Sequence, residues 1–413
     1  MAINIIEKPE LGSFISPHKD QQIAIHNWFA FKHSFSRELT INLINHFGLK
    51  ERDWVLDPFC GGGTTLLTCK ELGINARGYD ILPFSVFLSN VKTREYDKKY
   101  LSHQLEVFKN VKAQDINASM SLPAIPLVKK AFIPEVREAL IALKSRIEQI
   151  RDVKTRNYFN LAFLSIVEPV SNTSKTGGFL RIIKRQGINS TTPENLFLTK
   201  IDSMIQSLDN IRGSQNGAKI SVLARLADAR KLPTTRKFDA VITSPPYPNR
   251  HDYTRIYSLE MIFDFITSND ELKAIRYETI RSHVEARKKY EACNYRKPKK
   301  LDDIMQKIRL SETNNPQIIS MIEGYFEDMY LTLTEISHCL KRGGKVCMVV
   351  SNVRFAGVSV PVDEILSEVG EQTGLLSEDI WALRYRGNSS QQMKTYTRNP
   401  SRESIVFWRK DAQ

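Results

Sequence analysis

The stretch Trp54-Val-Leu-Asp-Pro-Phe-Cys-Gly-Gly-Gly-Thr-Thr-Leu-Leu67 predicts a short apolar strand, a glycine-rich turn and a helix that begins at Thr64. Glycines after a strand let the backbone approach a ligand closely, and the first turn of a helix has free N–H donors. Asp57 ends the strand, where its carboxylate would attract an ammonium group and repel a phosphate. The next strand ends in a second acid, Asp80, which suits ribose hydroxyls. S-adenosylmethionine has an ammonium group and a ribose but no pyrophosphate, so it fits this pattern better than a dinucleotide.

A second stretch, Asp239-Ala-Val-Ile-Thr-Ser-Pro-Pro-Tyr-Pro248, brings a hydroxyl, two rigid prolines and an aromatic ring to the end of another strand. Because prolines have a fixed φ and no N–H, the carbonyls beside them stay free as acceptors. The Ser244 hydroxyl and the Pro245 carbonyl can accept hydrogen bonds from an exocyclic amino group, while Tyr247 stacks on the ring that carries it. This pattern predicts chemistry on the amino nitrogen of a nucleobase.

Both stretches resemble motifs of the S-adenosylmethionine-dependent DNA amino-methyltransferases, a cytosine-N4 and adenine-N6 family. Residues 57–65 resemble motif I, and Thr243-Ser-Pro-Pro-Tyr247 resembles motif IV. Asp80 matches the acid of motif II, and Ala227-Asp228-Ala229 matches the motif III element that contacts the adenine of the cofactor. The segment Phe31-Lys-His-Ser-Phe-Ser-Arg-Glu-Leu39 resembles motif X, which closes over the methionine end of the cofactor.

The resemblance implies a class I methyltransferase fold, an α/β Rossmann-like architecture with a mostly parallel seven-stranded sheet and helical insertions. It also implies S-adenosyl-L-methionine as the cofactor, double-stranded DNA as the substrate, and no metal. The residues expected to bind the cofactor are Phe35, Ser36, Asp57, Pro58, Phe59, Cys60, Gly61, Gly63, Thr64, Thr65, Asp80, Ile81, Asp228, Ala229 and Ser244. Those expected at the reacting amine are Ser244, Pro245, Pro246 and Tyr247.

The serine before Pro-Pro-Tyr is typical of members that methylate cytosine N4, although some members with this serine methylate adenine N6. We therefore expect cytosine N4 methylation by base flipping and direct transfer, with adenine N6 methylation as the alternative. RNA guanine N2 methylation is disfavoured, because too few residues precede the first strand for an RNA-binding domain. The intact motifs disfavour an inactive DNA-binding scaffold. A restriction endonuclease acting on the same site is an implied partner, and an orphan enzyme is the alternative.

Composition supports an intracellular nucleic-acid enzyme. The 413 residues carry a net charge of +13, which points to a polyanionic partner, and 41% of them are hydrophobic, enough for a sizeable core. The five cysteines show neither Cys-x-x-Cys spacing nor a Pro-Cys pair. We therefore expect a reducing cytoplasm, no disulfides or zinc site, and no cytosine C5 chemistry. No apolar run is long enough for a membrane span, and the N-terminus lacks the pattern of a secretion signal.

Strands and helices alternate along the core, which predicts a mainly parallel sheet. We expect an N-terminal segment over residues 1–50 and a catalytic core over 51–95, 218–266 and 335–413, interrupted by a helical insertion (96–217) and a basic insertion (267–334). The expected strands are Trp54–Asp57, Ala76–Ile81, Ile220–Ala227, Phe238–Thr243, Lys345–Ser351, Ile380–Arg386 and Ser404–Arg409.

Both insertions carry candidates for DNA contact. A polar glycine loop that leads into a basic strand-like piece, residues 171–185, suits phosphates. Residues 281–300 hold eight basic residues against two acids. An ordinary surface loop and a solvated charged face are the competing interpretations. The residues expected to contact DNA are Lys175, Arg181, Lys184, Arg185, Asn249, Arg250, Asp252, Tyr253, Arg287, Lys288, Lys289, Tyr385 and Asn388.

Overall fold

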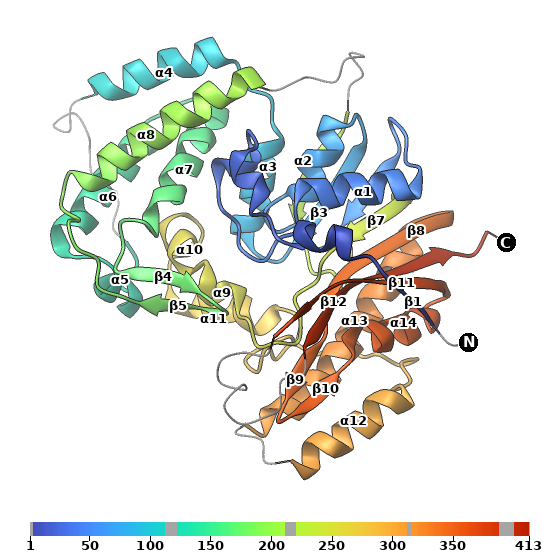
Figure 1. The fold of residues 1–413 in the computed structure, drawn as a ribbon. Helices are drawn as coiled ribbons and strands as arrows, with labels where there is room; N and C mark the ends of the chain where they lie inside the picture. The colour runs from blue at the N-terminus through green and yellow to red at the C-terminus, as the bar shows by residue number, and fades with distance from the viewer. Residues whose placement is uncertain (1–2, 112–121, 211–219, 312–314, 388–399, 413) are drawn as a thin grey trace.

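An eight-stranded sheet runs through the computed structural model, which describes residues 3–111, 122–210, 220–311, 315–387 and 400–412 (Figure 1). In spatial order the strands are β1 (Asn4–Glu7), β11 (Leu375–Arg386), β12 (Ser401–Lys410), β8 (Leu340–Ser351), β7 (Phe238–Thr243), β2 (Trp54–Asp57), β3 (Asn75–Asp80) and β6 (Val222–Leu226). The strands from β8 to β6 are parallel, and β12 is antiparallel to both of its neighbours. The expected class I methyltransferase fold is thus confirmed.

The edge strand β1 extends the expected seven strands to eight. It pairs in parallel with β11, from Asn4 opposite Asp379 to Glu7 opposite Ala382. Three of its four side chains are exposed. A short strand without an alternating apolar pattern gives no periodic signal in the sequence, because only backbone pairing defines it.

The sheet is covered on both faces, because neighbouring strand residues point to opposite sides. Val55 and Val349 pack against α1 and α2, whereas Leu56 and Val350 pack against α12, α13 and α14. These helices are α1 (Arg37–Phe47), α2 (Thr64–Glu71), α12 (Lys299–Leu310), α13 (Gln317–Cys339) and α14 (Val362–Glu371). The boundary expected at residue 334 therefore falls inside α13, a single helix of the sheet's cover.

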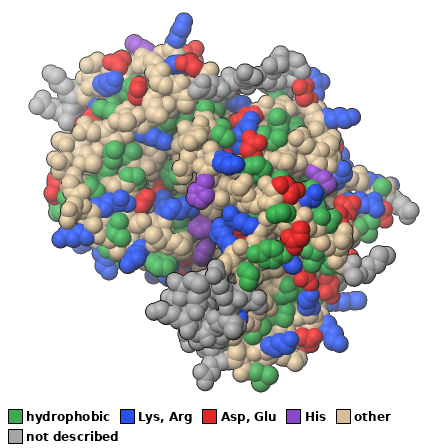
Figure 2. Space-filling model, viewed as in Figure 1, with side chains coloured by type: hydrophobic (Ala, Val, Ile, Leu, Met, Phe, Trp, Pro, Cys, Tyr) green, Lys and Arg blue, Asp and Glu red, His purple; other side chains and the backbone are tan. Residues whose placement is uncertain are grey.

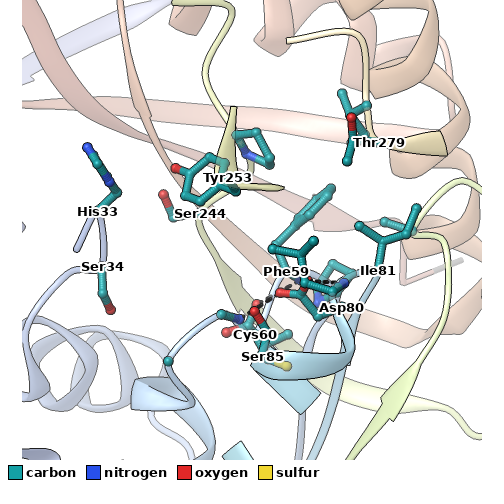
Figure 3. Close-up of a pocket in the computed structure, with 18 of the residues that line it drawn as sticks. His33, Ser34, Phe59, Cys60, Asp80, Ile81, Ser85, Ser244, Tyr253 and Thr279 are labelled. Carbon is teal, nitrogen blue, oxygen red and sulfur yellow. Dashed lines mark hydrogen bonds between the residues drawn. The ribbon is translucent and has the colours of Figure 1, made fainter. Parts of the chain in front are cut away.

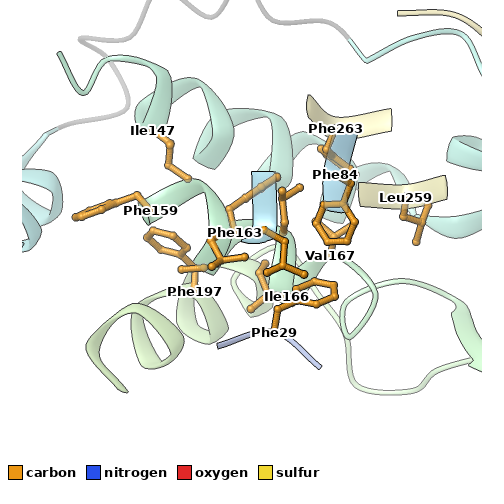
Figure 4. Packing of buried hydrophobic residues seen from close by; sticks show 14 of the residues in the cluster. Phe29, Phe84, Ile147, Phe159, Phe163, Ile166, Val167, Phe197, Leu259 and Phe263 are labelled. Atoms are coloured by element: carbon orange, nitrogen blue, oxygen red, sulfur yellow. The ribbon is translucent and has the colours of Figure 1, made fainter. Parts of the chain in front are cut away.

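A third hydrophobic cluster joins the helical insertion to the core (Figure 4). Phe159 and Phe163 of α7 contact Phe197 of α8 and Phe263 of α10, and Phe84 of α3 belongs to the same cluster. The elements of this region are α3 (Pro83–Thr93), α4 (Lys98–Asn110), α5 (Pro126–Ala131), α6 (Pro134–Glu148), α7 (Val153–Val167), β4 (Thr173–Thr176), β5 (Phe179–Ile182), α8 (Thr192–Gln206) and α10 (Ser258–Asp264). The insertion is therefore packed on the core and not merely tethered to it.

The remaining elements are short. They are the helices α9 (Tyr253–Ile256) and α11 (Asn269–Glu278), the strands β9 (Val353–Phe355) and β10 (Val358–Val360), and the 3-10 helices η1 (Pro9–Ile15), η2 (Lys19–Gln22), η3 (His26–Trp28) and η5 (Ser207–Asn210). None of the helices in the described ranges combines the length and apolarity that a bilayer crossing requires.

One ion pair is buried where the β4–β5 hairpin meets the core. Lys175 Nζ of β4 contacts Glu260 Oε1 of α10, and the two side chains are 5% and 1% exposed. The same ammonium lies 5.1 Å from the ring centroid of Phe29 and 4.9 Å from that of Tyr257. The expectation that Lys175 contacts DNA is therefore wrong, because its charge is neutralised inside the protein.

We expect Lys175→Met and Glu260→Gln each to lower the free energy of unfolding by about 3 kcal/mol, because each leaves a buried group unpaired. The double variant should lose less than the sum of the single losses. Urea unfolding followed by circular dichroism measures all three. Lys273→Met is the control, since Lys273 and its partner Asp270 are 45% and 89% exposed, and it should lose less than about 1 kcal/mol. Strictly additive losses at the buried pair would contradict this coupling.

Candidate active site

The turn between β2 and α2 is shaped by its glycines. Gly61 and Gly63 have φ values of +45° and +78°, a backbone conformation that favours glycine. A Cβ on Gly62 would lie 2.7 Å from Cβ of Phe31, and one on Gly63 would lie 2.8 Å from the hydroxyl of Ser89. The turn is thus pressed between the motif X-like segment and α3, which fixes the path of its backbone.

Asp57 connects this turn to the Ser-Pro-Pro-Tyr loop. Its buried carboxylate accepts a hydrogen bond of 2.6 Å from the Thr243 hydroxyl and one of 3.1 Å from the Phe59 backbone N–H. Thr243 is the last residue of β7, so the bond joins the carboxyl ends of two neighbouring parallel strands. Burial raises the pKa of Asp57 to about 6.

Asp80 holds the other side of the turn. Its carboxylate accepts hydrogen bonds of 2.9 Å from the backbone N–H groups of Gly61 and Leu82. Burial raises the pKa of Asp80 to about 6 as well. Two carboxylates that remain negative at neutral pH therefore face one site, which suits a ligand with a cationic group and hydroxyls.

A pocket with an empty volume of about 900 Å³ brings these elements together. Figure 3 shows Ser244 and Tyr253 on one side of this space, with Cys60 and Asp80 on another. Every residue expected to bind the cofactor lines the pocket except Ser36 and Gly63. Ser36 caps α1 by accepting a hydrogen bond from the Leu39 N–H, and Gly63 caps α2, so these two shape helix starts and do not face the pocket.

The pocket wall also contains residues that the sequence analysis did not place there. They are Leu82, Ser85, Tyr253, Thr279, Ile280, Ser282 and His283, beside Phe31, His33, Ser34, Gly62 and Ala227 of the expected motifs. Those from Thr279 to His283 follow α11, in the segment expected to contact DNA. Arg281 anchors this segment by a 2.7 Å ion pair with Asp328 of α13. Burial lowers the pKa of His33 to about 4, so its imidazole is neutral at physiological pH.

Ser244 lies where the pocket meets a second cavity, which has an empty volume of about 1,660 Å³. Its hydroxyl donates to the Val349 carbonyl at 3.1 Å and lies 3.1 Å from the Tyr247 hydroxyl. Tyr247 lines the second cavity and Pro246 lines the first, whereas Pro245 is buried and lines neither. The expected catalytic loop thus stands between the two cavities.

Asp228 lies at the far wall of the first pocket. Its carboxylate is held by Arg230 at 2.7 Å, and the Tyr290 hydroxyl donates to it at 3.2 Å. Arg230 in turn contacts Asp328 at 3.0 Å. This network fixes the loop after β6, which contains Asp228 and Arg230, against α13.

Three further residues expected to contact DNA have partners or positions within the protein. Arg185 donates to the Ser171 and Thr173 carbonyls and pairs with Glu168. Asp252 is 5% exposed, where it caps α9 and contacts Arg276 at 2.8 Å. Tyr253 lines the first pocket. Sequence could not separate these residues from surface ones, because polar loop composition does not reveal which side chains find internal partners.

The remaining DNA candidates are mostly exposed. Arg181, Lys184, Arg250, Arg287 and Lys289 are exposed, and Asn249 lines the second cavity. Lys288 pairs with Glu278, the exposed Tyr385 donates to Glu7, and Asn388 lies outside the described residues. Figure 2 shows basic and histidine side chains gathered where the helical part of the molecule meets the sheet. A polyanion is the partner that such a surface suits.

Comparisons with known proteins agree with this arrangement. The family model of N6/N4 methyltransferases, described as DNA methylase, matches residues 12–90. The chain is 30% identical to the type II methyltransferase M.BsoBI of Geobacillus stearothermophilus, and the alignment covers 99% of this chain and 90% of that protein. It is 29% identical to the type II methyltransferase M.AvaI of Anabaena variabilis, covering 93% and 86%.

The fold and the two acidic strand ends define a class I methyltransferase that uses S-adenosylmethionine. Within this class, the chain belongs to the N4/N6 family of DNA amino-methyltransferases, with type II enzymes as its relatives. The resemblance that motifs I and IV indicated is thereby confirmed.

We expect binding of S-adenosylmethionine to weaken as the pH falls through about 6, where the raised pKa values of Asp57 and Asp80 make both carboxyls protonate. In the expected binding mode, a neutral Asp57 would lose its attraction for the ammonium group of the cofactor. The Kd should rise roughly five- to twentyfold between about pH 7.5 and about pH 5.5. Calorimetric titration measures it, with methylthioadenosine, which lacks the ammonium group, as a less pH-sensitive control. A constant Kd would contradict this role for the two acids.

Proposed function

We propose that this protein transfers a methyl group from S-adenosylmethionine to the exocyclic N4 of cytosine in duplex DNA. The observation that carries the proposal is the position of Ser244, which lines the cofactor pocket and the second cavity at once. In this proposal the first pocket holds the cofactor, with Asp57 near its ammonium group and Asp80 near its ribose. The second cavity receives the base that is flipped out of the duplex.

The hydrogen bonds of Ser244 leave its oxygen able to accept a hydrogen bond from the amino group of the base. Because its own O–H donates to the Val349 carbonyl, the Tyr247 hydroxyl is the donor in the Ser244–Tyr247 pair, and one oxygen lone pair of Ser244 is left for the amino group of the base. We propose the Pro245 carbonyl as the second acceptor, held in place by the fixed φ angles of the two prolines. Two such bonds would draw the amine towards tetrahedral geometry, so that its lone pair becomes localised and can attack. When bound, S-adenosylmethionine would supply the electrophilic methyl group: the S–CH3 bond breaks as the N–CH3 bond forms, and the amine then loses one proton to solvent.

Tyr247 forms the remaining side of the reaction site in this proposal. Its hydroxyl lies 3.1 Å from that of Ser244, and burial raises the pKa of Tyr247 to about 12, so the phenol remains neutral. The ring is then available to stack on the flipped base. Positioning and fixed acceptors would supply most of the rate enhancement.

The assignment of the target base depends on the residue that precedes Pro-Pro-Tyr. Serine at position 244 favours cytosine N4, and adenine N6 is the alternative, reached with the same loop and cofactor. For DNA contact we retain three exposed candidates. Arg250 follows the catalytic loop along the chain, and Arg181 and Lys184 lie in or just after the β4–β5 hairpin, whose Gly178 lies against His251. We propose that the insertion over residues 96–217 takes part in reading the target sequence. The relatives are named as type II methyltransferases, which supports a restriction-modification role. A restriction endonuclease acting on the same site is the partner that we propose.

We expect Ser244→Ala to lower kcat by about 100-fold or more, because it removes an acceptor aimed at the reacting amine. The Kd for S-adenosylmethionine should change less than about twofold, since Ser244 does not bind the charged ends of the cofactor. Mass spectrometry of nucleosides from treated, unmethylated genomic DNA measures the product. Ser320→Ala, an exposed serine of α13, is the matched control and should leave kcat unchanged.

The same nucleoside measurement decides the target base. N4-methylcytosine from the wild type is the expected product, and N6-methyladenine without N4-methylcytosine would overturn the assignment. Sequencing that detects modified bases in a host expressing the chain returns the recognition site as well.

A further inference from the structure

A row of polar side chains crosses the sheet beside Ser244. The strand register places Ser351 of β8 opposite Glu403 of β12, and Glu403 opposite Arg384 of β11. Directly paired residues point to the same face of a sheet, and all three line the second cavity together with Ser244. The row begins next to the catalytic loop, because Ser244 donates to the carbonyl of Val349 in the same stretch of β8.

Glu403 holds two guanidinium groups in this row. Its side chain is 6% exposed, one carboxylate oxygen contacts Arg384 Nε, and the other lies 3.1 Å from Arg386 Nε. The terminal nitrogen Nη2 of Arg384 is buried and has no hydrogen-bond partner among the described residues. A buried donor without an acceptor is unfavourable by itself and is rare in folded proteins. Arg384 thus lines the cavity and keeps a charged donor that no other group among the described residues satisfies.

Cytosine and adenine, the two possible target bases, differ in the hydrogen-bond acceptors that lie beside the reacting amine. Beside its N4 amine, cytosine has two adjacent acceptors, N3 and O2. Beside its N6 amine, adenine has the single acceptor N1, followed by a C2–H group. A guanidinium has parallel N–H donors that match a pair of adjacent acceptors. Adenine in the same position would leave one donor against a C–H group, and such unpaired buried groups cause strong rejection.

We propose that Arg384 is a specificity-determining residue that donates hydrogen bonds to N3 and O2 of the flipped cytosine. The assignment rests on the proposed function, because it needs a base in the second cavity with its amine at Ser244. It explains why Arg384 keeps a donor unpaired although its Nε already contacts Glu403. The ion pair with Glu403 fixes the plane of the guanidinium before the base arrives.

The test compares two targets in one duplex that carries the recognition site found by sequencing. One has cytosine at the target position, and the other has 3-deazacytosine, which keeps the amine and O2 but replaces N3 by C–H. For the wild type, kcat/KM should fall by roughly 10- to 100-fold on this replacement. For Arg384→Met the two targets should differ less than about threefold, because the donor that distinguishes them is gone. A merely structural role would lower both values together and preserve the wild-type ratio.

Two further variants keep the test decisive. Arg384→Lys retains a positive charge beside Glu403 but loses the fork of donors, so it carries the test if Arg384→Met does not fold, and its ratio should also fall. Arg409→Met is the matched control: Arg409 pairs with Glu378 at 3.1 Å on the same two strands, away from the cavity, and it should keep the wild-type ratio.

The outcomes separate the two proposals. N4-methylcytosine from the wild type, together with an unchanged ratio in both Arg384 variants, would overturn the role of Arg384 alone. N6-methyladenine as the only wild-type product would overturn the proposed function and the role of Arg384 with it. A collapsed ratio in Arg384→Met or Arg384→Lys, with the control intact, supports the assignment.

Discussion

The hydrogen bond from Thr243 to Asp57 is the contact on which the site depends. At 2.6 Å and fully buried, it joins the ends of β7 and β2, which are neighbours in the sheet. One strand leads into the glycine turn and the other into the Ser-Pro-Pro-Tyr loop. A methyl donor and its acceptor must lie within reaction distance, and this bond sets the relative position of the two loops that would hold them. The rest of the sheet keeps the two strand ends in register.

The glycine turn and the proline loop could be predicted because their chemistry is local. A strand end, three glycines and a helix start are consecutive in the chain, so the position of Asp57 and Asp80 at one edge follows from the parallel sheet alone. The charged candidates were less predictable. Lys175 was expected on the surface, yet its partner Glu260 is 85 residues away in sequence, and no spacing rule connects the two.

The row of Ser351, Glu403 and Arg384 also could not be predicted from the sequence. Its members come from three strands, and only the pairing register brings them to one face. Likewise, Thr279 and His283 reach the cofactor pocket because Arg281 is anchored to Asp328, a contact between distant segments. Local motifs predict the backbone of the site, whereas much of its lining is decided by tertiary packing.

The added strand β1 also affects how molecules of this protein behave towards one another. Without it, the twelve residues of β11 would form a long open border of the sheet, with unpaired backbone donors and acceptors. Long open borders of this kind invite pairing with a second chain and lead to aggregation. A four-residue strand that ends in a glutamate pairs with Asp379 to Ala382 and so covers the middle of that border. The first residues of the chain thus favour solubility as well as completing the fold.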